Sequence, residues 1–203
     1  RYIGEQLASI AAQTYPAWSL LISDDGSNDR TLEICREFAA HYPEHQVRVV
    51  AGPRRRSTAN FLHLVHTIDS FDEADLFAFC DQDDVWLPEK LARAVTAIQA
   101  APLRERQAAL YGARTRLVDH RLQPIGISPL PARPLGFGNA LLQNIASGNT
   151  MVFNAPLLRL LRCVDPANAV LHDWTASQAV TGCGGWMFFD PDPCLLYRQH
   201  DHN

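Results

Sequence analysis

Residues 75–91 read DLFAFCDQDDVWLPEKL and are the most informative stretch for the fold class. The apolar run 75–80 predicts a short buried strand, because strands of parallel sheets are apolar on both faces. The polar turn 81–84 follows it, and Pro88 suits the first turn of a helix. Leu91, Val95 and Ile98 then recur at helical spacing. A buried strand, a polar turn and an amphipathic helix together form one unit of an α/β fold.

The same alternation of strand and helix precedes this stretch. Apolar runs predict strands at 18–23 and 46–51, and apolar residues at helical spacing predict helices at 3–13, 32–39 and 58–69. Strands that alternate with helices favour a largely parallel sheet covered by helices. The first half of the chain is therefore expected to be regular α/β.

The pattern changes after residue 105. We expect a strand over 108–118, a long proline-rich loop over 119–138, and a short helix over 139–145. A strand at 149–153, helices at 155–162 and 173–180, and short strands at 187–189 and 194–197 follow. Long loops in a compact domain are often functional. The second half is therefore expected to be α+β.

Composition and charge narrow the class of protein. The chain has 203 residues, a length typical of one domain. Its 18 Lys and Arg against 22 Asp and Glu give a net charge of −4, which disfavours nucleic acid as a partner. Its five cysteines form no CxxC pair and no zinc-like spacing, which favours a reducing compartment. No apolar run approaches the roughly 20 residues of a membrane span.

Acidic residues follow two of the predicted strands. Asp24 and Asp25 come after the first, and Asp81, Asp83 and Asp84 after the third. The carboxyl ends of parallel strands share one edge, where ligands bind. Clustered carboxylates repel unless a cation binds or a pKa rises, and hard oxygen ligands suit Mg²⁺ or Mn²⁺. Ordinary turn and cap roles are the alternative, above all for the first pair.

Several segments in order resemble family 2 glycosyltransferases. Residues 81–91 are similar to that family's DXD segment, in the form of its rhamnosyltransferase-like members. The other matching segments are 2–10, 13–15, 23–31, 147–151, 172–174 and 197–200. Each motif is weak alone, but their order and separations cover nearly the whole chain. The resemblance implies a GT-A fold, which is α/β with a Rossmann-like mixed sheet flanked by helices.

The resemblance also implies a reaction and roles for single residues. It implies a nucleotide-diphosphate sugar donor, Mg²⁺ or Mn²⁺ as cofactor, and inversion at the anomeric carbon. The matching positions are Asp24 or Asp25 for the donor base, Asp81 for the ribose and base, Asp83 for the metal, Asp173 as catalytic base, and His200 near the metal or diphosphate.

The metal and the catalytic base that the resemblance implies each meet a chemical need of sugar transfer. A cation stabilises the negative charge that develops on the departing diphosphate, and a base takes the proton of the attacking hydroxyl. One carboxylate suffices for a single in-line displacement, which inverts configuration. Asp173 stands at a predicted helix start, where a simple cap role is the alternative.

We expect one catalytic domain over 1–203, with residues 1–105 binding the nucleotide sugar and 106–203 binding the acceptor. The family's first strand and its tail have no counterpart here, so the sequence is expected to be a catalytic core without them. The expected donor sugar is L-rhamnose on dTDP, and the expected acceptor is a polysaccharide or a lipid-linked saccharide. The expected location is the cytoplasm, with peripheral association at the inner face of the membrane. The sequence does not predict an oligomeric state.

Three other classes of protein remain as alternatives. A receiver-like phospho-accepting domain also places acids at strand ends, but it needs a lysine at a later strand end, and Lys90 lies in a predicted helix. A metal-dependent phosphohydrolase needs its DxD motif after the first strand. A catalytically inactive relative that only binds sugar nucleotides is disfavoured by the presence of both Asp83 and Asp173.

Overall fold

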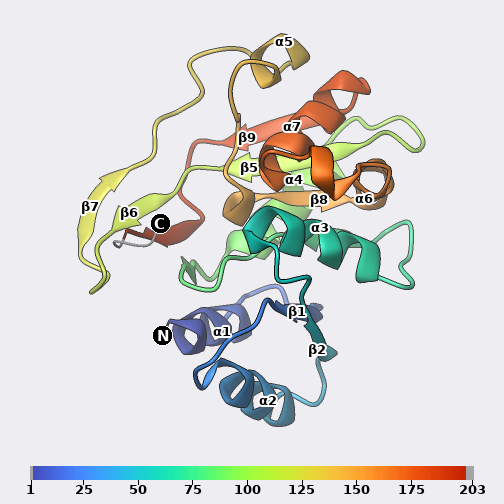
Figure 1. The fold of residues 1–203 in the computed structure, drawn as a ribbon. Coiled ribbons are helices and arrows are strands. Elements are labelled where there is room, and N and C mark those ends of the chain that lie inside the picture. Colours follow the sequence, from blue (N-terminus) through green and yellow to red (C-terminus); the bar gives the residue numbers. More distant parts are fainter. Residues whose placement is uncertain (1, 200–203) are drawn as a thin grey trace.

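The computed structural model describes residues 2–199 and centres on a four-stranded sheet of order β3-β8-β5-β9 (Figure 1). Its strands are β3 (Leu76–Ala78), β8 (Val152–Asn154), β5 (Ala109–Ala113) and β9 (Trp186–Asp190). β8 is antiparallel to both β3 and β5, whereas β9 is parallel to β5. β3, β5 and β9 therefore run in one direction, and the sheet is mixed.

Helices cover both faces of this central sheet. The helices are α1 (Ile3–Ala11), α2 (Thr31–His41), α3 (Arg56–Thr67), α4 (Lys90–Ala100), α5 (Phe137–Ala140), α6 (Ala155–Arg162) and α7 (His172–Gly182). One core joins the sheet to α3, α6 and α7, and Leu110 and Phe153 point into it. A second core joins the opposite face to α1 and α4, and Tyr111 and Val152 point into that one. Alternate residues of β5 and β8 thus enter opposite cores, as the strand period requires.

Two further sheets flank the centre. β1 (Leu20–Asp24) and β2 (Val47–Ala51) form a parallel pair that packs with α1 and α2, at the bottom of Figure 1. The second has the order β4-β10-β6-β7, with bounds β4 (Val85–Trp86), β10 (Leu195–Arg198), β6 (Arg116–Val118) and β7 (Pro124–Ile127). β7 is an edge strand, antiparallel to β6.

The α/β expectation is confirmed, and the second half of the chain is more divided than its sequence indicates. The single strand expected over 108–118 is wrong, because β5 and β6 lie in different sheets. Between them, Arg114 N–H donates to the carbonyl of Asp190, and the chain then turns into the outer sheet. The loop expected over 119–138 contains β7, which begins with a proline at a sheet edge. Such positions are among the few that proline tolerates in a sheet.

The short elements near residue 150 also differ from expectation. The helix expected at 139–145 is instead α5, which begins at Phe137 and ends at Ala140. The strand expected at 149–153 is a 3₁₀ turn, η1 (Gly148–Thr150), followed by β8. A second 3₁₀ turn, η2 (Pro166–Asn168), lies between α6 and α7. None of the helices described between residues 2 and 199 has the length and apolarity that a membrane span requires.

Candidate active site

The acidic turn, residues 81–84, lies at the carboxyl edge of the central sheet, just beyond β3. η1 reaches the same edge, because it precedes β8, which runs against β3. The start of α7 also lies there, since that helix leads into β9, which is parallel to β5. Three segments far apart in the sequence therefore converge on one edge, where open α/β sheets bind ligands.

Two carboxylates lie near enough to Asp81 at this edge to act on its charge. Burial, together with the charges of the neighbouring Asp83 and Asp173 carboxylates, raises the pKa of Asp81 to about 7. Like charges disfavour the ionised form only at close range. The structure thus brings together Asp81, Asp83 and Asp173, three of the residues expected from the sequence.

Asp84 anchors the acidic turn from inside the protein. Its side chain is fully buried, and its carboxylate accepts hydrogen bonds from the Asn149 side-chain amide and from the Arg198 backbone N–H. Burial, followed by the charge of Asp81, raises the pKa of Asp84 to about 8. With its oxygens bound to protein donors, Asp84 holds the turn in place.

The turn η1 links the acidic turn to α7. Asn149 binds Asp84, and the Gly148 N–H donates to Asp173 Oδ2 over 2.9 Å. A Cβ on Gly148 would lie 2.5 Å from His172 Nε2, so only glycine fits this approach. One glycine and one asparagine thereby position two carboxylates from different elements.

Asp173 is the second residue of α7, with its carboxylate held in place on both oxygens. Its Oδ1 accepts from the Trp174 N–H over 2.8 Å, while Oδ2 accepts from Gly148. The Trp174 indole N–H donates to the carbonyl of Ala140, which ties α5 to α7. Exposed N–H groups at a helix start favour an anionic side chain there. The helix therefore fixes the direction of this carboxylate.

His172 is buried beside Asp173. Its ring stacks on Phe61 with centroids 4.1 Å apart and meets Phe79 edge to face at 4.9 Å. Neither ring nitrogen has a hydrogen-bond partner among the described residues. Burial therefore lowers the pKa of His172 to about 4, against the opposing effect of the Asp173 carboxylate. The uncharged ring therefore packs against Phe61 and Phe79 at the start of α7.

Arg198 connects the acidic turn to the rest of the chain. The side chain is almost fully buried and donates to the carbonyls of Asp83 and His120, each over 2.9 Å. It also donates to Glu5 Oε2 over 2.7 Å, and its guanidinium lies over the Tyr2 ring. Sequence reasoning gave Arg198 no role, although it lies within the matching segment 197–200. The same reasoning missed Asn149 and Gly148, whose signal was the segment 147–151.

Asp24 and Asp25 lie at the end of β1, where they bind backbone groups. Asp24 accepts from the N–H groups of Gly26 and Ser27, as in a turn. Asp25 accepts from the N–H groups of Arg54 and Arg56, and so fastens the loop that follows β2. These contacts are local to β1, β2 and the loop that follows β2, and neither acid is among those that act on Asp81. His200, expected near the metal, lies outside the described residues.

The donor chemistry at the acidic turn fits a divalent cation. No group of three or more His, Cys, Asp or Glu side chains that could hold a metal occurs within residues 2–199. Mg²⁺ and similar ions are nevertheless often held by one or two carboxylates and completed by substrate phosphates. Burial and then the neighbouring carboxylates raise the pKa of Asp81, and a cation would relieve the repulsion between these carboxylates. The site therefore fits a metal that a diphosphate completes.

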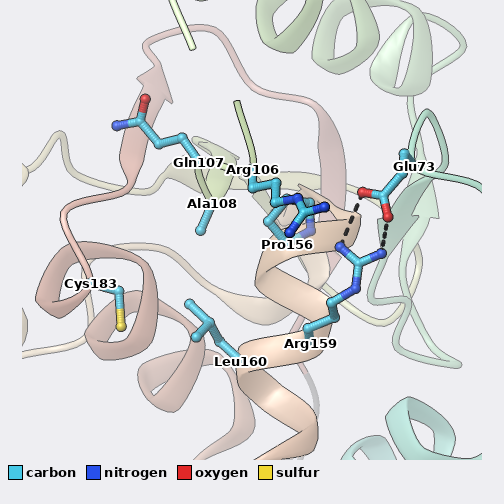
Figure 2. Close-up of a pocket in the computed structure, with 8 residues that line it drawn as sticks. All are labelled: Glu73, Arg106, Gln107, Ala108, Pro156, Arg159, Leu160 and Cys183. Carbon is cyan, nitrogen blue, oxygen red and sulfur yellow. Dashed lines mark hydrogen bonds and ion pairs between the residues drawn. The ribbon is translucent and has the colours of Figure 1, made fainter. Parts of the chain in front are cut away.

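A cavity lies at another place in the fold. It measures about 450 Å³ and is lined in part by Glu73, Ala108, Arg159 and Cys183 (Figure 2). These residues precede β3, β5 and β9 or lie in α6, so the cavity is at the amino edge of the sheet, opposite the acidic turn. Glu73 and Arg159 form an ion pair across it (Figure 2). Carboxylate chemistry, not cavity size, therefore locates the candidate site.

Comparison with known proteins agrees with this arrangement. Residues 1–112 match the family described as Glycosyl transferase family 2. The dTDP-rhamnosyl transferase RfbG of Shigella flexneri is 31% identical over 215 aligned residues, which include all of this chain and 70% of that protein. The chain belongs to glycosyltransferase family 2. It is accordingly a glycosyltransferase that uses a nucleotide-sugar donor, and the receiver-like and phosphohydrolase alternatives are wrong.

Two further comparisons bear on fold and substrate class. The fold matches the mannosyltransferase PcManGT of Pyrobaculum calidifontis, solved in complex with GDP-Man and Mn²⁺, with a TM-score of 0.68 at 20% identity. That match covers 96% of this chain and 52% of the other, and it confirms the GT-A fold. The Escherichia coli enzyme WfgD, named as a UDP-Glc:α-D-GlcNAc-diphosphoundecaprenol β-1,3-glucosyltransferase, is 28% identical over 89 residues. That alignment covers 44% of this chain and 32% of the enzyme.

Proposed function

We propose that this chain transfers a deoxysugar, L-rhamnose, from a dTDP-linked donor to a lipid-linked or polysaccharide acceptor, with inversion at the anomeric carbon. The full-length similarity to a protein named as a dTDP-rhamnosyl transferase supports the donor. The similarity to a protein named for a diphosphoundecaprenol-linked acceptor supports the acceptor class. The observation that carries the mechanism is the meeting of Asp81, Asp83 and Asp173 at one sheet edge.

In this proposal, Asp173 is the general base. Its carboxylate takes the proton of the acceptor hydroxyl as that oxygen bonds to the anomeric carbon. The bond from that carbon to the donor diphosphate breaks in the same displacement, so the sugar changes configuration. The N–H groups of Gly148 and Trp174 hold the carboxylate in the direction of attack.

The acidic turn binds the donor. Mg²⁺ or Mn²⁺ held by Asp83, with His200 as a second protein ligand, would stabilise the charge of the departing diphosphate as a Lewis acid. Asp81 orients the donor ribose and base, and Asp24 or Asp25 contacts the base. Asp84 and Arg198 hold the backbone of the acidic turn in place through their hydrogen bonds.

The two halves of the chain divide this work. Residues 1–105 carry the acidic turn and the donor contacts, and residues 106–203 carry the base and the acceptor side. We place the reaction in the cytoplasm, at the inner face of the membrane, where lipid-linked acceptors are reached. An inactive relative that only binds sugar nucleotides is the remaining alternative, and the experiment below separates the two.

Asp173→Asn tests the assignment of the base. Transfer from dTDP-rhamnose should fall by about 10²- to 10⁴-fold, the usual contribution of a general base. The affinity for dTDP with Mn²⁺, measured by isothermal titration calorimetry, should stay unchanged. Asp69→Asn is the matched control, because Asp69 is exposed and forms only a surface ion pair with Arg48. Substantial turnover by Asp173→Asn would refute the role.

Asp83→Asn tests the metal separately. This variant should lose the Mn²⁺-dependent part of dTDP binding, whereas Asp173→Asn keeps it. Nucleotide binding by the wild-type chain without transfer to any acceptor would favour the inactive relative. Binding that is the same with and without Mn²⁺ would refute the metal site.

A further inference from the structure

The segment 114–142 combines exposed apolar side chains with positive charge. It contains β6, β7, α5 and the loop between them, and it runs along one side of the molecule from β7 to α5 (Figure 1). Most of the large apolar residues that the structure exposes belong to it: Ile125, Ile127, Leu130, Phe137, Leu141 and Leu142. We call this segment the basic apolar rim.

The charge of the basic apolar rim is opposite to that of the chain. Four arginines stand against one aspartate, a formal net charge of +3 in a chain of −4. Arg116, Arg121 and Arg133 are exposed. Asp119, the only acid, is already occupied, because its carboxylate accepts from the N–H groups of Arg121 and Gln123. One acid against four arginines therefore leaves most of the positive charge of the rim unbalanced within the segment.

Strand register places an apolar and a basic side chain on one face of the outer sheet. Ile125 and Ile127 both lie on β7, and Ile125 falls where the pairing with β6 shifts register. Arg116 pairs directly with Ile127 across the strands, and directly opposed residues project to the same side. Ile125 is 59% exposed and Ile127 50% exposed. An arginine thus lies beside the uncovered Ile127, and a second uncovered isoleucine belongs to the same strand.

We propose that the basic apolar rim docks on a bilayer that contains anionic lipid. Apolar side chains that enter the headgroup region and arginines that meet anionic headgroups are the two components of such binding. A second copy of this chain fits less well, because the prolines at 124, 129, 131 and 134 hinder pairing along the exposed edge of β7.

The rim also packs against the helix that carries Asp173. Trp174 and Gln178 of α7 donate to the carbonyl of Ala140, and Phe137 packs against Gly182. Docking would therefore bring the acceptor side of the site to the lipid surface. This consequence depends on the proposed function, whereas the docking itself does not.

Cosedimentation with vesicles tests the docking without donor or acceptor. The chain should bind vesicles of phosphatidylcholine with phosphatidylglycerol, and raised salt should release it. Arg116→Gln/Arg121→Gln/Arg133→Gln should weaken binding by about a hundredfold, since each arginine near an anionic surface contributes roughly fivefold. Ile125→Ser/Ile127→Ser should weaken it by about tenfold or more.

A triple variant with the same loss of charge is the control. Arg36→Gln/Arg104→Gln/Arg106→Gln removes three exposed arginines outside the rim and should leave vesicle binding unchanged. Thermal unfolding of every variant checks that each is folded. Equal weakening by the control, equal binding to pure phosphatidylcholine, or no vesicle binding would overturn the proposal. So would a wild-type dimer in sedimentation that the rim variants abolish, because the rim would then bind a second copy.

Discussion

The buried His172 should make the stability of this protein fall sharply in mild acid. The imidazole is 8% exposed, and its pKa of about 4 lies below the ordinary value of roughly 6.5. The unfolded chain therefore takes up a proton near pH 6.5, whereas the folded chain resists it until about pH 4. Protonation favours the unfolded state, so stability is complete above pH 6.5 and is lost as the pH falls through this window.

The size of the loss follows from the two pKa values. The gap between the folded and unfolded pKa of His172 lowers the unfolding free energy by about 2 kcal/mol at pH 5, and by about 3 kcal/mol below pH 4, relative to pH 8. His172→Leu removes the titrating ring and two polar nitrogens that have no partner among the described residues. Between pH 8 and pH 5, the variant should gain about 2 kcal/mol relative to the wild type.

Urea unfolding of both proteins at several pH values measures this gain. The carboxylates are common to the two proteins, so their contributions largely cancel in the difference. His66→Gln is the control, because His66 is exposed on α3 and lies away from the site. Its profile should run parallel to that of the wild type. If the His172→Leu profile also ran parallel, the folded protein would not be resisting protonation of the imidazole, and the predicted loss of stability in acid would be refuted.

Three other substitutions test how the site is held. Gly148→Ala should lower the unfolding free energy by about 1–3 kcal/mol, because the added Cβ meets the His172 ring; Gly4→Ala, with open space around it in α1, should not be destabilising, and equal losses would contradict the steric reason. Arg198→Met should lower the unfolding free energy, measured in urea, by about 3 kcal/mol, because it removes a buried side chain that several carbonyls and a carboxylate contact. A loss below about 1 kcal/mol would contradict this structural role of Arg198. Lys90→Met should leave the unfolding free energy unchanged or raise it by about 1 kcal/mol, because the buried ammonium has no hydrogen-bond partner in the described chain. A clear loss of unfolding free energy in urea would show instead that the contact of the ammonium with the Trp86 ring stabilises the fold by more than its burial costs.

Local pattern was sufficient for the helices of the first half and for β1, β2 and β3, but it did not indicate the two-residue strand β4. The strand and helix around residues 75–91 were predicted because periodicity and the turn residues between them lie within one short stretch. The family could be read from contiguous motifs for the same reason. The acids of the site were also nameable, since each falls inside such a motif.

Strand 108–118 shows where local pattern fails. Its apolar residues continue from β5 into β6, and nothing in their spacing marks the point where the chain leaves one sheet for another. Strands distant in sequence decide where the chain changes sheet, because β9 pairs with β5 and β10 pairs with β6. Sheet membership is a property of these long-range pairs.

The sequence by itself determined the α/β class, the family and the list of acidic residues, because these depend on residues close together in the chain. Only the tertiary structure decided which acids lie near one another. Asp173 lies about 90 residues from the acidic turn, and they meet because β8 and α7 both begin at the carboxyl edge of β3. Gly148, Asn149 and Arg198 then hold them there through hydrogen bonds that no local pattern encodes.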